Sequence, residues 1–195
     1  MSQPTSREDG EVVREFLSIA DLLERTPLAQ IYAHLYHEGA GTVRELMDAL
    51  DLSQGTAYTY VNQLADAGIL TIATDSQPRQ YAAVEIELTL TVDGDRRYTI
   101  SPALIEAVAR RATDETIDSY IDRRGIDGLA TALTYTVARE RGETTHRLMA
   151  GDLDLSALEA EVILQALRPV AHEHFSFEDH GASLADVVDT EDLDV

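Results

Sequence analysis

The sequence contains no cysteine, no lysine and no tryptophan. Without cysteine, the chain has neither a disulfide framework nor a thiolate metal site. It also lacks an unbroken apolar stretch of about 18 residues, so neither a membrane-spanning helix nor a membrane partner is expected. Residues 1–9 are polar and lack the apolar core of a signal peptide. These absences predict a cytoplasmic protein.

The charge of the chain is strongly one-sided. All 15 basic residues are arginines, 36 acidic residues outnumber them, and the formal net charge is −21. Such a charge normally opposes DNA binding, because DNA phosphates repel carboxylates. Because 44% of the residues are hydrophobic and lie in periodic stripes, the composition favours a folded protein over a disordered one. An acidic, lysine-free composition resembles that of haloarchaeal proteins, and in molar salt the Debye length of about 3 Å screens the charge.

Residues 42–70 contain two short helical patterns joined by a link of about three residues, which sets two helices at a steep angle. Ser53 is a good N-cap for the second helix, and Gly68 is expected to end it. The apolar residues lie at helical spacing, namely Val43, Leu46, Met47 and Leu50 in the first pattern and Ala57, Val61 and Leu64 in the second. The pattern predicts a helix-turn-helix.

This stretch resembles the winged-helix regulators of the MarR, ArsR and TrmB type. The matching positions are Thr42, Glu45, Leu46, Leu50, Leu52, Ser53, Thr56, Ala57, Val61, Leu64, Gly68, Ile69 and Leu70. The resemblance implies a winged helix-turn-helix domain at residues 26–84 that binds double-stranded DNA. Helix 54–67 is then the recognition helix in the major groove, and residues 71–84 are the wing on the backbone or minor groove. Its first helix is expected at 27–37, with Thr26 as N-cap.

The rest of the chain divides into three parts. Residues 1–25 are an N-terminal segment with an amphipathic helix at 11–23, and residues 176–195 are expected to be an acidic, mostly disordered tail. Residues 85–175 are predicted to form a β-hairpin followed by a helical domain for dimerisation or effector binding. The expected fold class is therefore α+β, mainly α: a winged helix-turn-helix domain, a β-hairpin and a helical C-terminal domain.

Within the C-terminal part, alternating apolar and polar residues on both sides of Asp93-Gly94 predict the hairpin. Gly125 and Gly142 are predicted to stop helices, and Pro169 to end or kink the last one. The expected helices are 102–112, 114–124, 127–141 and 156–168. No run of proline, glycine or serine separates the two domains at 84–86, so we expect them to sit rigidly against each other.

The outward face of helix 54–67 carries uncharged polar side chains and no acid before Asp66. Glutamine and asparagine can bond adenine through both amide atoms, and threonine can contact a thymine methyl group or a phosphate. Tyrosine can bond a phosphate or stack, and glycine lets the DNA backbone approach closely. The candidate DNA-binding residues on this helix are Gln54, Gly55, Thr56, Tyr58, Thr59, Asn62 and Gln63. Unlike many relatives, the helix has no basic residue.

Two arginines outside this helix complete the candidate site. Arg44 lies on the preceding helix, where it either contacts a phosphate or pairs with Asp48 four residues later. Arg79 lies near the tip of the wing, where it either reaches the DNA or pairs with a neighbouring carboxylate. The sequence alone leaves both alternatives open.

Metal binding and catalysis receive little support. The cluster His172, Glu173, His174 and His180 lacks the helical spacing of metal ligands and has no cysteine beside it, so no metal site is predicted. His34 and His37 are expected on a helix surface. No nucleophile elbow, phosphate loop or zinc-protease motif is present, so we expect no catalytic residue, no enzyme activity and no cofactor. The sequence names no effector.

Two functions from different classes remain. The acid-free helix face favours a DNA-binding regulator, whereas Tyr58 and Tyr60 leave room for a winged helix that only docks proteins. A single winged helix covers little DNA, so a two-fold homodimer is expected. The broad apolar face of helix 156–168 is the predicted dimer contact, through Leu155, Leu158, Val162, Ile163 and Leu167.

Overall fold

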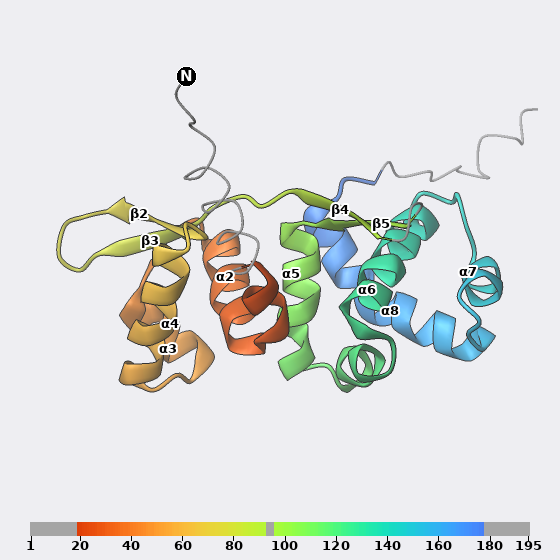
Figure 1. Ribbon diagram of the computed structural model, residues 1–195, viewed down its shortest axis with the longest axis horizontal. Coiled ribbons are helices and arrows are strands. Elements are labelled where there is room, and N and C mark those ends of the chain that lie inside the picture. Colours follow the sequence, from red (N-terminus) through yellow and green to blue (C-terminus); the bar gives the residue numbers. More distant parts are fainter. Residues whose placement is uncertain (1–18, 93–95, 178–195) are drawn as a thin grey trace, which may run out of the picture.

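The computed structural model describes residues 19–92 and 96–177. Most of the predicted helix 11–23, the Asp93-Gly94 turn and most of the predicted acidic tail lie outside these residues, although residues 19–24 are helical. Figure 1 shows an elongated molecule with the wing at one end, α7 at the other and α5 between them. No helix in the described ranges is long and apolar enough to cross a membrane.

The N-terminal part is a winged helix-turn-helix. Three helices, α2 (Thr26–Glu38), α3 (Val43–Leu50) and α4 (Gln54–Asp66), precede a small antiparallel sheet. The sheet has the order β1-β3-β2, from β1 (Gly41–Thr42), β2 (Leu70–Thr74) and β3 (Gln80–Ala83). The predicted inward residues Ala57, Val61 and Leu64 are all buried against α2 and α3, as the helical spacing required.

The helix ends follow local capping rules with one exception. The Ser53 hydroxyl accepts a hydrogen bond from the Thr56 amide, so the predicted N-cap of α4 is confirmed. Thr42 and Glu45 form a reciprocal capping box at the start of α3. The predicted N-cap Thr26 is wrong: α2 begins at Thr26 itself, and Arg25 before it makes no side-chain cap. Pro27 in the first turn suits this start, since it lacks the N–H that a cap would serve.

The C-terminal part begins with the predicted hairpin, in which β4 (Leu88–Val92) pairs antiparallel with β5 (Arg96–Ile100). It continues as α5 (Pro102–Ala109), a 3₁₀ turn η1 (Arg110–Ala112), α6 (Glu115–Glu140), α7 (His146–Asp152) and α8 (Ala157–His174). Every residue of α5 is buried, because this helix packs on α2 on one side and on α6 and α8 on the other. Residues of α2 and α8 therefore belong to one continuous core.

The predicted stop at Gly125 is confirmed: φ is 72° there, and this non-helical backbone divides α6 into two helical stretches that correspond to the predicted helices 114–124 and 127–141. Two other features of this part differ from the prediction. Helix α7 was not predicted, because it is short and contributes only Met149 and Ala150 to the core. Pro169 does not end α8, which continues to His174 because Val170 and Ala171 beyond the proline are buried.

Candidate nucleic-acid interface

The exposed face of α4 is the first component of the interface. Gln54, Gly55, Tyr58, Thr59 and Asn62 are exposed, and Tyr58 retains 49% of its surface. Thr56 is half-buried at the start of the helix. A Cβ built at Gly55 meets nothing within 4 Å, so the backbone there is open to an approaching ligand. The arc expected from 3.6 residues per turn is therefore the one that faces outward.

Internal hydrogen bonds limit what some of these side chains can offer. The Thr59 hydroxyl donates to the Gly55 carbonyl at 2.7 Å, and the hydroxyls of Ser53 and Thr56 lie 2.8 Å apart. Thr59 therefore presents its methyl group and an accepting oxygen. The Asn62 side chain is exposed, and no residue in the described ranges forms a hydrogen bond with its amide.

Gln63 occupies a different position from its neighbours. Its side-chain oxygen accepts a 3.1 Å hydrogen bond from Arg25, and its nitrogen lies 3.4 Å from a carboxylate oxygen of Asp21. The Arg25 guanidinium also lies over the Tyr60 ring, 5.0 Å from its centroid. Gln63 and Tyr60 thus hold the segment that precedes α2 against the flank of α4.

The wing carries its arginine in an ion pair. The Nη2 and Nε atoms of Arg79 lie 2.8 and 3.0 Å from one oxygen of Asp75, across the turn between β2 and β3. This is the neighbouring-carboxylate alternative from the sequence. Because 44% of the Arg79 side chain and 76% of the Asp75 side chain are exposed, the pair is weak and can open to admit a phosphate.

Packing brings Arg44, Tyr58 and Arg79 to one hollow of about 240 Å³ between α3, α4 and the wing. Arg44 is exposed and forms no ion pair within the described residues, so the pair with Asp48, one of the two alternatives that the sequence left open, is absent there. Two guanidinium groups and a phenol beside one hollow suit a phosphate, which accepts hydrogen bonds from all three.

The hollow is also bordered by Gln77, Pro78 and Tyr81, which were not among the predicted DNA-binding residues. Tyr81 lies two residues after Arg79, and side chains two apart on a strand share a face. The two-residue spacing in the sequence could therefore have indicated that Tyr81 lies beside Arg79.

The predicted dimer face is only partly available. On α8, Ile163 and Leu167 are 1% and 0% exposed, because they pack inside their own subunit. Leu158 and Val162 are 73% and 43% exposed. The prediction that Ile163 and Leu167 contact a partner is therefore wrong, and the apolar surface of α8 consists of Leu158 and Val162.

Two stretches of the chain match known domain families. Residues 29–87 match a family described as "Sugar-specific transcriptional regulator TrmB", and residues 111–176 match a family of unknown function (DUF7437). No curated protein matches the chain, and no solved structure does. Residues 29–87 are thus similar to the TrmB regulator domain, a winged-helix type, and this similarity supports DNA binding and transcription regulation in general.

Proposed function

We propose that this chain, through its TrmB-type domain, is a sequence-specific DNA-binding transcription regulator. In this proposal α4 enters the major groove, and the wing lies on the backbone or in the minor groove. One observation carries it: the exposed, acid-free face of α4 adjoins the hollow that Arg44, Tyr58 and Arg79 border. Base-reading groups and phosphate-binding groups then form one continuous surface, as major-groove recognition requires.

Each side chain has a role that its chemistry permits. Asn62 and Gln54 read adenine through their amides, and the Thr56 and Thr59 methyl groups contact thymine. Tyr58, Arg44 and Arg79 bind phosphates around the hollow, and Gly55 admits the DNA backbone. For Gln63, the contacts with Arg25 and Asp21 favour a positioning role, in which it holds α4 against the preceding segment.

The proposed setting is the cytoplasm of a haloarchaeon. Residues 26–83 carry six acids and only two bases, Arg44 and Arg79. At low salt, repulsion between these carboxylates and DNA phosphates opposes binding. In molar salt the repulsion is screened, and hydrogen bonds from uncharged side chains supply the affinity. The acidic, lysine-free composition supports this setting.

The proposed assembly is a two-fold dimer that presents two α4 helices to half-sites about 34–36 Å apart. Leu158 and Val162 lie exposed on α8, beside Tyr120 and Arg123 of α6. Large apolar side chains exposed together on one face are typical of protein contacts. A symmetric contact through this face doubles the DNA surface that each molecule covers.

A second function, protein docking by the winged helix without DNA, draws support from Tyr58 and Ile72, which are 49% and 47% exposed. Aromatic and aliphatic anchors of this kind are common in protein interfaces. The absence of acids on the exposed face of α4 up to Asp66 favours DNA, because a docking surface gains nothing from excluding them.

The test is selection of genomic DNA fragments by the purified chain in about 1 M KCl, where the charge is screened. Sequencing of the retained fragments should yield a recurring motif with two half-sites, and Asn62→Ala should lose the enrichment. Retention of no motif by a folded protein at any salt concentration contradicts DNA recognition and leaves the docking function.

A further inference from the structure

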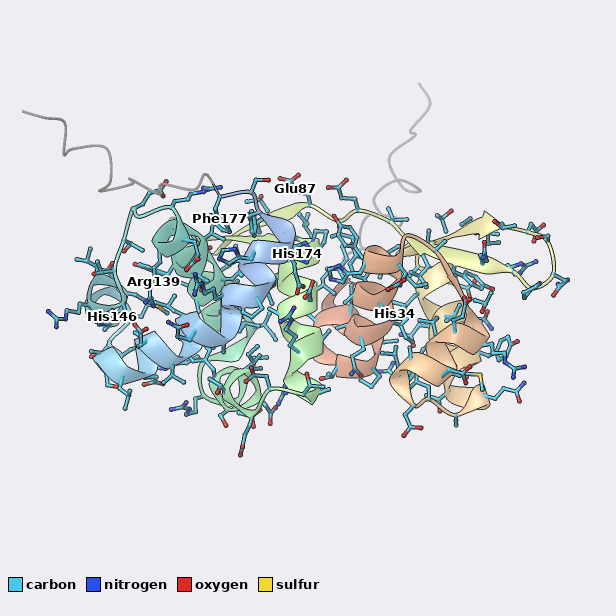
Figure 2. All side chains as sticks on the ribbon, turned by 180° about the vertical axis from the view of Figure 1, so that it is seen from behind. His34, Glu87, Arg139, His146, His174 and Phe177 are labelled. Atoms are coloured by element: carbon cyan, nitrogen blue, oxygen red, sulfur yellow. The ribbon has the colours of Figure 1, made fainter. Side chains whose placement is uncertain are left out.

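Two histidines from opposite ends of the described chain converge on one buried carboxylate. His37 lies in the last turn of α2, Glu106 lies on α5, and His174 is the last residue of α8. The Nε2 atoms of His37 and His174 each lie 2.5 Å from Oε2 of Glu106. In Figure 2, His174 lies at the end of α8, where that helix meets α5 and α2. The cluster thus joins the winged domain to the C-terminal helices.

We propose that His37, Glu106 and His174 bind a divalent transition-metal ion of the zinc, cobalt or nickel type. The three donor atoms all lie within 4.8 Å of one another, two are imidazole nitrogens and one is a carboxylate oxygen. This donor set suits these metals, whereas magnesium and calcium prefer oxygen alone. The site needs no contact with DNA and stands independently of the proposed function.

The carboxylate is oriented by a group behind it. Arg110 donates from Nη2 and Nε to the other oxygen of Glu106, at 2.5 and 3.0 Å. Oε2 is consequently left facing the two imidazoles. Three cationic or N–H-bearing side chains thus converge on this carboxylate, Arg110 on one oxygen and His37 and His174 on the other. A ligating carboxylate that is itself held by a hydrogen-bonding neighbour is the usual arrangement at a metal site.

A fourth ligand and a route for the ion are both available. Oε2 of Glu173 lies 3.8 Å from Nε2 of His37 and accepts from Nη2 of Arg110 at 2.6 Å. Its side chain is 44% exposed, so it can exchange Arg110 for an ion or leave the position to water. His174 and the Tyr36 ring stacked on it border a hollow of about 510 Å³. His37 is 41% exposed. The site is therefore enclosed on the Glu106 side and reachable from solvent on the other.

Binding changes the local geometry in a defined way. Donor atoms about 2.0–2.1 Å from one zinc ion are separated by roughly 3.3 Å in a tetrahedral site. The present His–Glu contacts of 2.5 Å must each lengthen by roughly 0.8 Å to admit the ion. The ion then replaces two protons as the link between α2, α5 and α8.

The experiment uses the full chain, freed of metal, in about 1 M KCl with excess Mg²⁺, so that the many surface carboxylates are screened and occupied. Co²⁺ is titrated while its visible d–d absorption is recorded, and Zn²⁺ is then added as a competitor. We expect one Co²⁺ per chain, an intense absorption typical of a four-coordinate site, displacement by Zn²⁺ and a higher melting temperature with metal.

Variants identify the ligands. His37→Ala, His174→Ala and Glu106→Gln should each lower metal affinity by at least about 100-fold, the upper range for losing even a group behind a ligand. The matched control is His172→Ala, which lies on α8 as His174 does. The His172 imidazole contacts Glu140 outside the cluster, so this variant should bind the metal as tightly as the wild type does. His37→Ala is decisive if the buried variants fail to fold, because this side chain is 41% exposed.

Two results overturn the site. The first is a wild-type protein that shows no single saturable Co²⁺ site, which reduces the cluster to a hydrogen-bonded junction. The second is unchanged affinity and spectrum in His37→Ala, which assigns the ion to other groups. Circular dichroism of each metal-free variant verifies that the comparison is made between folded proteins.

Discussion

Arg25 donates a 3.1 Å hydrogen bond to the side-chain oxygen of Gln63, whereas the adjacent Asn62 amide has no partner among the described residues. Two neighbouring amides on α4 therefore differ in what they can offer a ligand. Asn62 can bond a base without losing any contact with the described residues. Gln63 can do so only by giving up Arg25.

The difference between Asn62 and Gln63 leads to the first prediction. Asn62→Ala should weaken specific DNA binding by about 1–3 kcal/mol, the usual value of a good base contact, and leave the fold intact. Gln63→Ala should weaken it less and mainly loosen the segment around Arg25. Operator affinity by fluorescence anisotropy measures both, with Gln165→Ala, an exposed amide on α8, as the control. Equal affinity of Asn62→Ala and wild type removes Asn62 from the interface.

The Arg79–Asp75 pair on the wing predicts that substitutions of its two members change DNA affinity in opposite directions. Asp75→Asn frees the guanidinium and removes a charge that repels DNA, so affinity should rise. Arg79→Gln should lower the affinity for all DNA sequences alike. It should also make the slope of log affinity against log salt concentration less negative by about 1. Arg168→Gln, which breaks a comparable pair with Glu140 on α8, should change neither quantity. A fall in affinity with Asp75→Asn contradicts the proposed wing contact.

The salt dependence should separate this protein from ordinary DNA-binding regulators. With only Arg44 and Arg79 as bases in residues 26–83, a dimer can neutralise about two to four phosphates, each contributing about −0.9 to the slope. Screening of carboxylate–phosphate repulsion acts in the other direction. Specific affinity should therefore stay flat or rise between about 0.5 and 2 M KCl, where an ordinary regulator loses orders of magnitude.

The measurement is anisotropy across that range, with circular dichroism at each salt concentration. A steep loss of affinity by a folded protein refutes both the salt argument and the role of uncharged side chains in recognition.

The exposed pair on α8 predicts the assembly. Leu158→Glu and Val162→Glu should convert the dimer to a monomer, because a charge buried in an apolar contact has no partner. Light scattering at micromolar protein in molar KCl gives the mass. Ala49→Glu adds the same charge to an exposed position on α3 and should leave the dimer intact. A wild-type monomer under these conditions refutes the dimer.

The link between α6 and α7 predicts a response to alkaline pH. The Tyr135 hydroxyl donates to Asp152 at 2.6 Å, and this bond, with some burial, raises the pKa of Tyr135 from 10.0 to about 12. The neutral phenol is favoured in the fold, so its contribution is complete below pH 10.0 and is lost as pH rises toward about 12. In denaturant unfolding, the wild type should lose stability between pH 10.0 and about 12, and Tyr135→Phe should lose less over the same range. An identical pH dependence in wild type and variant contradicts the assignment.

The sequence by itself determined the elements whose causes are local. Helices α3 and α4 follow from apolar spacing within single turns and from the Ser53 cap, and the outward face of α4 follows from the same period. The hairpin follows from alternation, and the bend of α6 follows from Gly125, since glycine adopts a positive φ without penalty. Each of these signals operates over a few residues, so it is present in the chain before any packing.

Only the tertiary structure decided which distant groups meet. The hollow of Arg44, Tyr58 and Arg79, the bond between Arg25 and Gln63, and the junction of His37, Glu106 and His174 all join residues far apart in the chain. Packing of α3, α4 and the wing creates the hollow, the seating of Arg25 against α4 creates the bond to Gln63, and packing of α2, α5 and α8 creates the histidine–glutamate junction. Core packing also carries α8 past Pro169 by burying the residues beyond it. The spacing of residues along the chain does not predict which distant side chains meet. The distance between them in space is set by the burial of apolar faces on other parts of the helices.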